Sequence, residues 1–235
     1  MTAPWESWIT TYSGRRVAPL GAQVETICID DIAHALALKC RWTGHCRTFY
    51  SVADHSLRVA RVLKDQGASP LTQIEGLLHD CGEAYLPDVA APIKACILAH
   101  GQPGLAALAV PHERRVVVEP CVDASRGFAD HVPPTGDLDV FYGLSTFAGA
   151  ERRLLTVILA ALGLSDVLTK ADWRAVKFAD LVLLSTEARD LMHGTGGWPW
   201  TPPDPLVEKI VPLGWSEAED AFLALNAHLR REAGL

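Results

Sequence analysis

Repeated helix-start signals, each followed by an apolar stripe, constrain the fold of this chain more than any other feature. Ser51 precedes a segment whose apolar residues recur at helical spacing until Gly67. Ser69 followed by Pro70 is a second start, because proline suits the first turn of a helix. That second segment is expected to end near Gly82. The spacing predicts helices rather than strands.

The same signals predict an all-α fold with one interruption. Asp30 and Asp31 are expected to cap a first helix, and Thr169 and Ser216 later ones. Residues 101–147 are rich in glycine and proline, so we expect a loop-rich insertion there, with a short strand at 116–118. The whole chain, 1–235, is expected to form a single domain. The further helices are expected over about 30–40, 87–97, 148–162, 169–192 and 216–231.

Composition excludes several classes of partner. The formal net charge of -7 and a pI of about 5.7 argue against binding a nucleic-acid polymer, which requires clustered Lys and Arg. No signal peptide is recognisable at the N-terminus, and no run of eighteen apolar residues predicts a membrane span. The six cysteines form no Cys-x-x-Cys pair, which favours reduced thiols and a cytoplasmic protein.

The stretch LLHDCGEAYLPD places several titratable groups directly after an apolar helix. His79 and Asp80 are adjacent, Glu83 follows one turn after His79, and Asp88 comes five residues later. Imidazole and carboxylate together suit Mn, Fe, Co, Ni or Zn, and carboxylate also accepts Mg. A His-Asp pair alone is more often an exposed helix end than a metal site, so other ligands are needed.

His55 and Asp180 are the candidates for those ligands. His55 shares a helical face with Val59 and Val62, so it is expected to face the core, where a hydrogen-bonded histidine is the commoner case. Asp180 adjoins an apolar run and is costly to bury unpaired, although it could instead face solvent beside Lys177. Taken together, two imidazoles and two carboxylates from three helices form a plausible open metal site.

These residues resemble the H…HD…D pattern of the HD-domain phosphohydrolases. The nearer resemblance is to the branch of bacterial 5'-deoxynucleotidases and phage dATP triphosphohydrolases, and it covers about 9–96 and 148–193. It implies an HD-domain helical bundle in which the 101–147 insertion has no counterpart among the smallest members. The motifs are Ile29–Leu36 (IDDIAHAL), Cys40–His45 (CRWTGH), Phe49–Ser56 (FYSVADHS), His79–Glu83, Pro92–Lys94 and Lys177–Asp190.

The resemblance also implies roles for individual residues. One divalent metal (Mn, Co, Zn, Ni, Fe or Mg) would be held by His55, His79, Asp80 and Asp180, with Asp80 and Glu83 as the catalytic pair and Glu83 positioning the attacking water. Arg41 would contact phosphate, Trp42 and Asp88 the sugar, and Lys94 and Lys177 a polyphosphate. His45 lies in a matching segment and is counted among the substrate-binding candidates.

The implied activity is hydrolysis of 2'-deoxynucleotides by a cytoplasmic homo-oligomer. Two lysines offer more positive charge than one phosphate requires, which favours a dATP-type triphosphohydrolase that releases deoxynucleoside and triphosphate. The alternative is a 5'-deoxynucleotidase that releases phosphate from monophosphates. A remoter alternative is a nucleotide-binding protein without catalysis, against which Glu83 argues.

Overall fold

The computed structural model describes residues 7–89, 147–165, 171–194, 198 and 201–235. The chain divides into two compact units, residues 1–88 with 151–235 and residues 89–150. The described ranges leave out the predicted strand at 116–118, most of the helix expected from residue 87, and all but the last residue of the 101–147 insertion.

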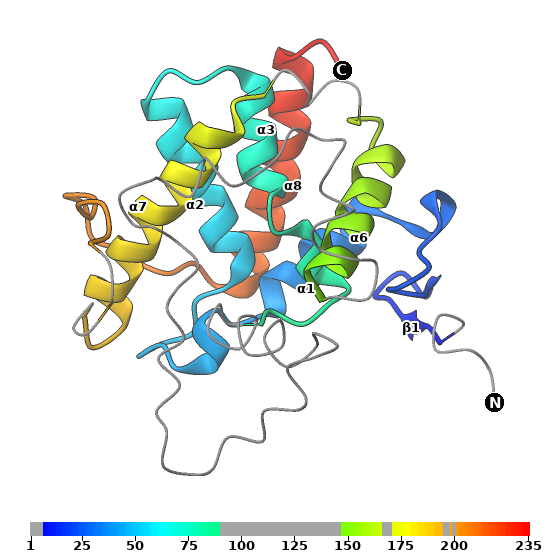
Figure 1. Ribbon diagram of the computed structural model, residues 1–235, viewed down its shortest axis with the longest axis horizontal. Coiled ribbons are helices and arrows are strands. Elements are labelled where there is room, and N and C mark those ends of the chain that lie inside the picture. Colours follow the sequence, from blue (N-terminus) through cyan, green and yellow to red (C-terminus); the bar gives the residue numbers. More distant parts are fainter. Residues whose placement is uncertain (1–6, 90–146, 166–170, 195–197, 199–200) are drawn as a thin grey trace, which may run out of the picture. The chain divides into compact units, whose positions relative to one another are not determined.

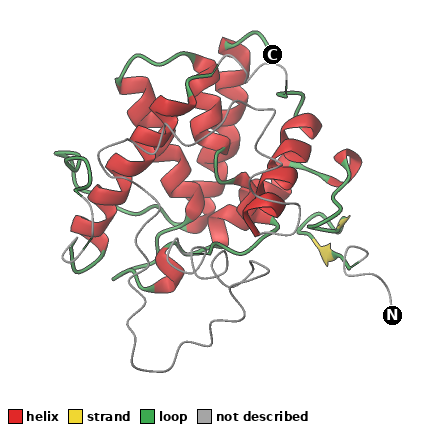
Figure 2. Cartoon of the chain, viewed as in Figure 1, coloured by secondary structure: helices red, strands yellow, loops and turns green. Residues whose placement is uncertain are grey.

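The first unit is mainly helical, which confirms the all-α class in its coarse form (Figures 1 and 2). A small antiparallel pair, β1 (Ile9–Thr10) and β2 (Arg16–Val17), precedes the helices. The α-helices are α1 (Ile29–Leu38), α2 (Val52–Asp65), α3 (Pro70–Leu78), α6 (Phe147–Ala161), α7 (Trp173–Leu191) and α8 (Trp215–Glu232). Among the helices of the described ranges, none combines the length and the apolar character that a membrane span requires.

Helix α2 is central to the packing. It contacts α1, α3, α7 and α8, and Figure 1 shows it between α7 and α8. One apolar cluster joins Val59 and Leu63 of α2 to Ala179 and Leu183 of α7. Because α2 packs against α3 and α7, side chains on its inner face can meet residues from both helices.

Several predicted helix caps are confirmed and others are wrong. Ser51 and Ser69 accept hydrogen bonds from the N–H groups three residues later, as expected of N-caps. Helix α7 begins after Asp172, whose carboxylate accepts from two backbone N–H groups, so Thr169 is not the cap.

The caps predicted for the first and last helices are also wrong. Helix α8 begins at Trp215, directly after Gly214, so Ser216 lies inside the helix and is not its cap. Asp31 does not cap α1. Its carboxylate instead accepts hydrogen bonds from Thr11 and Ser13, which anchors the N-terminal segment.

Candidate metal centre

The local sequence of α2 carries His55 into the interior. The helix begins at Val52, held by the Ser51 cap, and His55 follows on the same stripe as Val59. Both side chains are fully buried, which confirms that His55 faces the core. An imidazole in such a place requires a hydrogen-bond partner or a metal for each nitrogen.

His79 and Asp80 lie where α3 ends. The α-helix stops at Leu78, earlier than the predicted end near Gly82, and a separate 3-10 turn, η4 (Cys81–Ala84), follows. The Nδ1 atom of His79 lies 2.7 Å from the carbonyl oxygen of Gly76, one turn back. This contact orients the ring so that Nε2 points away from its own helix.

Helix α7, which packs against both α2 and α3, supplies Asp180. Its Oδ1 atom lies 3.3 Å from Nε2 of His55, and its Oδ2 atom accepts a hydrogen bond of 2.7 Å from Nζ of Lys177. Asp180 therefore lies beside Lys177 without facing solvent, since only 18% of its side chain is exposed.

Three of the four predicted ligands form one group. His55, His79 and Asp180 each offer one ligand atom, and these atoms all lie within 4.8 Å of one another. Asp80 lies beside this group, with Oδ2 3.1 Å from Nε2 of His79 and 3.9 Å from Nε2 of His55. The fold thus brings all four residues together from two helices, α2 and α7, and from the residues that directly follow a third, α3.

The donor atoms fit a metal. Nε2 of His55 and Nε2 of His79 are both buried, and neither has a hydrogen-bond partner within the described ranges. Each nitrogen instead lies close to a carboxylate oxygen, at 3.1 Å for His79 and Asp80 and at 3.3 Å for His55 and Asp180, without the geometry of a hydrogen bond. A metal bound between these atoms would satisfy the nitrogens and the carboxylates together. Two imidazole nitrogens and carboxylate oxygens form a donor set that suits a first-row divalent metal.

Strong mutual attraction offsets the cost of burying these charges. Burial lowers the pKa of His79, but Asp80, with smaller effects from Asp180 and the Gly76 carbonyl, raises that pKa to about 9. Burial opposes ionisation of Asp80 and Asp180, yet the two histidines, with Lys177 for Asp180, hold the pKa of each well below its ordinary value. Both carboxylates are thus in the ionised form that a metal ligand requires.

Arg41 and Trp42 reach the centre from the loop after α1. The turn η3 (Trp42–Gly44) has left-handed backbone at Trp42 and Thr43, with φ of 57° and 54°. Nη1 of Arg41 lies 3.6 Å from Oδ2 of Asp80. The guanidinium predicted to contact phosphate is therefore next to the cluster, and the strained turn that carries it is of the kind that concentrates at functional sites.

One buried carboxylate connects the cluster of candidate metal ligands to the loop that carries Arg41 and Trp42. Sequence reasoning assigned it no role. Glu187 of α7 is fully buried and contacts His55 through Oε1 and both Arg41 and Trp42 through Oε2. Glu187 lies two helical turns after Asp180, so both carboxylates are on the same face of an apolar helix. That spacing is the sequence signal that could have identified Glu187.

Glu83 and Asp88 lie near a cation that the sequence did not single out. Glu83 is buried on η4, and Asp88 is half-buried beyond it. Burial lowers the pKa of Lys39, against the opposing effect of the Glu83 and Asp88 charges. Nζ of Lys39 donates a hydrogen bond of 2.7 Å to the carbonyl oxygen of Leu86, which holds its ammonium group on this side of the centre.

The remaining predicted substrate residues differ in their placement. His45 is exposed and follows η3, while Lys94 lies outside the described residues. Trp198 stacks near Trp42, with ring centroids 6.5 Å apart.

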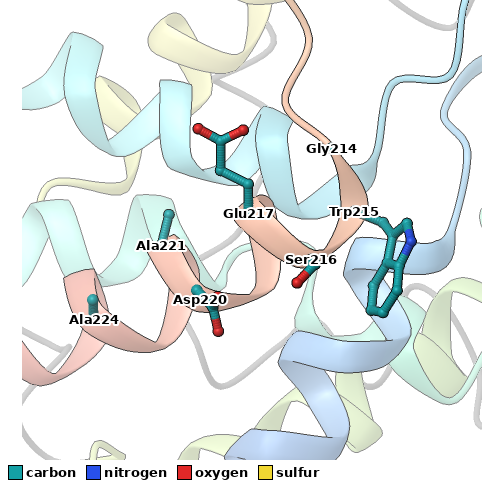
Figure 3. A pocket seen from close by; sticks show the side chains of 7 residues that line it. All are labelled: Gly214, Trp215, Ser216, Glu217, Asp220, Ala221 and Ala224. Atoms are coloured by element: carbon teal, nitrogen blue, oxygen red, sulfur yellow. The ribbon is translucent and has the colours of Figure 1, made fainter.

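A surface hollow of about 730 Å³ lies at the start of α8, away from these residues. It is lined in part by Trp215, Glu217 and Asp220, whose side chains point in different directions in Figure 3. A ligand site requires polar groups that converge on one point, so we assign the chemistry to the buried cluster rather than to this hollow.

No protein-family model matches the chain. It is similar to the uncharacterized protein YfdR of Escherichia coli, with 28% identity over 220 residues that cover 92% of each chain. It is also 39% identical over 95 residues to an uncharacterized protein of Rhodobacter capsulatus, covering 39% of this chain and 48% of that relative. Neither relative has an assigned activity.

Proposed function

We propose that this chain is a metal-dependent phosphohydrolase of the HD-domain superfamily that acts on 2'-deoxynucleotides. The observation that supports the proposal most directly is the convergence of the buried Nε2 atoms of His55 and His79 with an oxygen of Asp180, all within 4.8 Å of one another. The two nitrogens face ionised Asp80 and Asp180. The proposed reaction is hydrolysis of a dATP-type triphosphate to deoxynucleoside and triphosphate.

The proposed metal ligands are His55, His79, Asp80 and Asp180. When bound there, a divalent cation would supply a Lewis acid for the phosphoryl oxygen and lower the pKa of a coordinated water. The chain's own contribution is to keep both carboxylates ionised and both Nε2 atoms directed at one point. Holding the ligands in place before the metal arrives reduces the ordering that binding would otherwise require.

The other roles follow from charge and burial. Arg41, which is largely buried beside Asp80, would bind a phosphate oxygen with its guanidinium group. Glu83 would accept or hold the proton of the attacking water, since it is buried at the end of the segment that carries His79. Asp88 and Trp42 would contact the sugar.

The monophosphatase alternative is favoured by one contact. Nζ of Lys177 is 2.7 Å from Oδ2 of Asp180, so part of its charge is already balanced. A lysine that is paired in this way offers less to a polyphosphate than the sequence alone suggests. A 5'-deoxynucleotidase that releases phosphate from a monophosphate is therefore the second candidate.

Product analysis decides between the two candidates. Each dNTP and dNMP is incubated with the protein and Mn²⁺, Co²⁺, Ni²⁺, Zn²⁺ or Mg²⁺, and the products are separated by chromatography. Deoxynucleoside plus triphosphate from a dNTP supports the first candidate, and phosphate released only from dNMPs supports the second. His79→Ala should lose metal and turnover together. Absence of turnover under every condition would contradict both candidates.

A further inference from the structure

Glu187 bridges the proposed metal centre and the proposed substrate loop. Its Oε1 atom lies 2.6 Å from Nδ1 of His55, which is 132 positions away in the sequence. Its Oε2 atom accepts hydrogen bonds from Nε of Arg41 at 3.2 Å and from the indole N–H of Trp42 at 3.0 Å. The side chain is fully buried, so these three residues satisfy it in place of water.

The two oxygens of Glu187 can only accept hydrogen bonds while it is ionised. Two nitrogens of the Arg41 guanidinium lie 3.2 Å from Oε2, and this always-charged group pairs with a carboxylate rather than with a neutral carboxyl. Nδ1 of His55 must therefore be the donor in the 2.6 Å contact. In the neutral ring the proton is then on Nδ1, and Nε2 keeps its lone pair on the side of His79 and Asp180.

We propose that Glu187 is a positioning residue that fixes the metal-ligating tautomer of His55 with one oxygen and holds Arg41 and Trp42 with the other. This inference rests on the proposed function, because it takes His55 as a metal ligand. A single buried carboxylate then links the geometry of the metal centre to that of the loop that would bind phosphate and sugar. Hydrogen-bonded carboxylates behind ligating histidines act in this way in metal sites.

The amide Glu187→Gln tests the proposal because it keeps the shape but has only one acceptor oxygen. Arg41 can donate but never accept, so the amide oxygen should turn towards Arg41 and Trp42. The amide NH₂ group would then face His55 and donate to Nδ1. Nδ1 would become the acceptor, the proton would move to Nε2, and that nitrogen could no longer bind a metal.

The measurement is the tautomer of His55 itself. Long-range ¹H–¹⁵N spectra of the full chain, recorded with a chelator at a pH where the same spectra show His55 to be neutral, distinguish the two forms. His55→Gln assigns the resonances. We expect the Nδ1–H form in the wild type and the Nε2–H form in Glu187→Gln. A wild type in the Nε2–H form, or no change in the variant, would overturn the proposal.

Metal affinity gives the second readout, measured by calorimetry with Mn²⁺ or Co²⁺ alone. Glu187→Gln should weaken binding by about 10- to 100-fold, the usual effect of removing such a partner. Glu187→Asp keeps the charge and two acceptor oxygens, so it should recover part of the lost metal affinity. This variant also provides a test if Glu187→Gln fails to fold. Equal metal affinity in the wild type and both variants would overturn the proposal.

Asp190→Asn is the matched control. Asp190 is three residues further along α7 and is paired with Arg189, so its loss perturbs the same helix without touching the centre. It should leave the His55 tautomer and the metal affinity unchanged. A wild type that shows the Nδ1–H tautomer but binds no metal would refute the proposed function. Whether Glu187 fixes that tautomer would still be decided by the spectra of the wild type and Glu187→Gln.

Discussion

Lys177 and Asp180 form an ion pair of 2.7 Å on α7, and the same carboxylate faces His55 with its other oxygen. The two oxygens of Asp180 therefore have different partners. One is available to a metal together with His55 and His79. The other holds an ammonium group at the edge of the centre, where Lys177 is partly exposed.

Lys177→Met should separate the two possible roles of this lysine. If the ammonium group binds polyphosphate, the KM for a dNTP should rise about tenfold or more, since a hydrogen bond to a charged group contributes roughly 1.5 kcal/mol. The KM for a dNMP should change less, and metal binding should not weaken. Steady-state kinetics with both substrates, using the exposed Lys64→Met as control, measure this. An equal rise for both substrates would contradict a polyphosphate role.

Removal of a proposed ligand should abolish stoichiometric metal binding. His55→Ala or His79→Ala takes one of the two buried Nε2 donors out of the group that spans 4.8 Å. Metal content after dialysis and elemental analysis checks this. His228→Ala is the matched control, because His228 is exposed on α8 and paired only with Glu232 among the described residues. Full metal content in His55→Ala would exclude His55 as a ligand.

The parts of the fold that the sequence predicted well are those determined by nearby residues. Ser51 and Ser69 are correct caps because the N–H groups that they satisfy lie within one helical turn. Asp31 was misassigned because its partners, Thr11 and Ser13, are on a distant segment that competes for the carboxylate. A local helix-start pattern does not show that another segment of the chain will bind the same carboxylate.

In the candidate site, too, the sequence predicts what nearby residues determine and misses what distant segments determine. His55 and Asp180 could be predicted because each is a polar residue beside an apolar helical stripe, which is readable locally. The role of Glu187 could not, because its three partners come from two other segments of the chain. Which oxygen meets which donor depends on how α2 and α7 pack, and no periodicity encodes that arrangement.

Glu83→Gln should reduce turnover while leaving the metal in place. Glu83 is buried on η4, four residues after His79, and is proposed to handle the proton of the attacking water. Loss of such a group typically lowers kcat by about 10²- to 10⁴-fold. Metal affinity should match the wild type, and Glu75→Gln on α3 serves as a control carboxylate. Undiminished kcat in Glu83→Gln would remove Glu83 from the mechanism.

Gly76→Ala should destabilise the contact between α2 and α3. A Cβ atom at this position would overlap Cδ1 of Leu63 and lie 3.2 Å from Cγ1 of Val59, and both side chains are fully buried. Overpacking of this kind costs about 1–3 kcal/mol, partly offset by the better helix propensity of alanine. Urea denaturation should show the loss. Gly214→Ala, with open space around the added methyl, introduces no overpacking and should cost at most about 1 kcal/mol, since alanine is a poorer N-cap of α8 than glycine.

Glu75 should make the metal-free protein less stable as the pH rises. One of its carboxylate oxygens is buried without a hydrogen-bond partner in the described ranges, and burial raises its pKa to about 7. Its pKa in the folded state is thus above the ordinary value of 4.5. The protonated carboxyl is favoured by folding, so its contribution to stability is present at low pH and is lost between about pH 4.5 and 7.

Glu75→Gln removes the titration of Glu75. His79 is present in both proteins, so its contribution cancels when the variant is compared with the wild type. At pH 8 the variant should be more stable than the wild type by about 1 kcal/mol, a figure reduced for the partial exposure of Glu75. At pH 5 the two should differ much less. Urea denaturation at both pH values, in the presence of a chelator, measures the difference, and the exposed Glu25→Gln should show none. A stability difference that does not grow with pH would mean that the Glu75 carboxylate is satisfied in the folded protein.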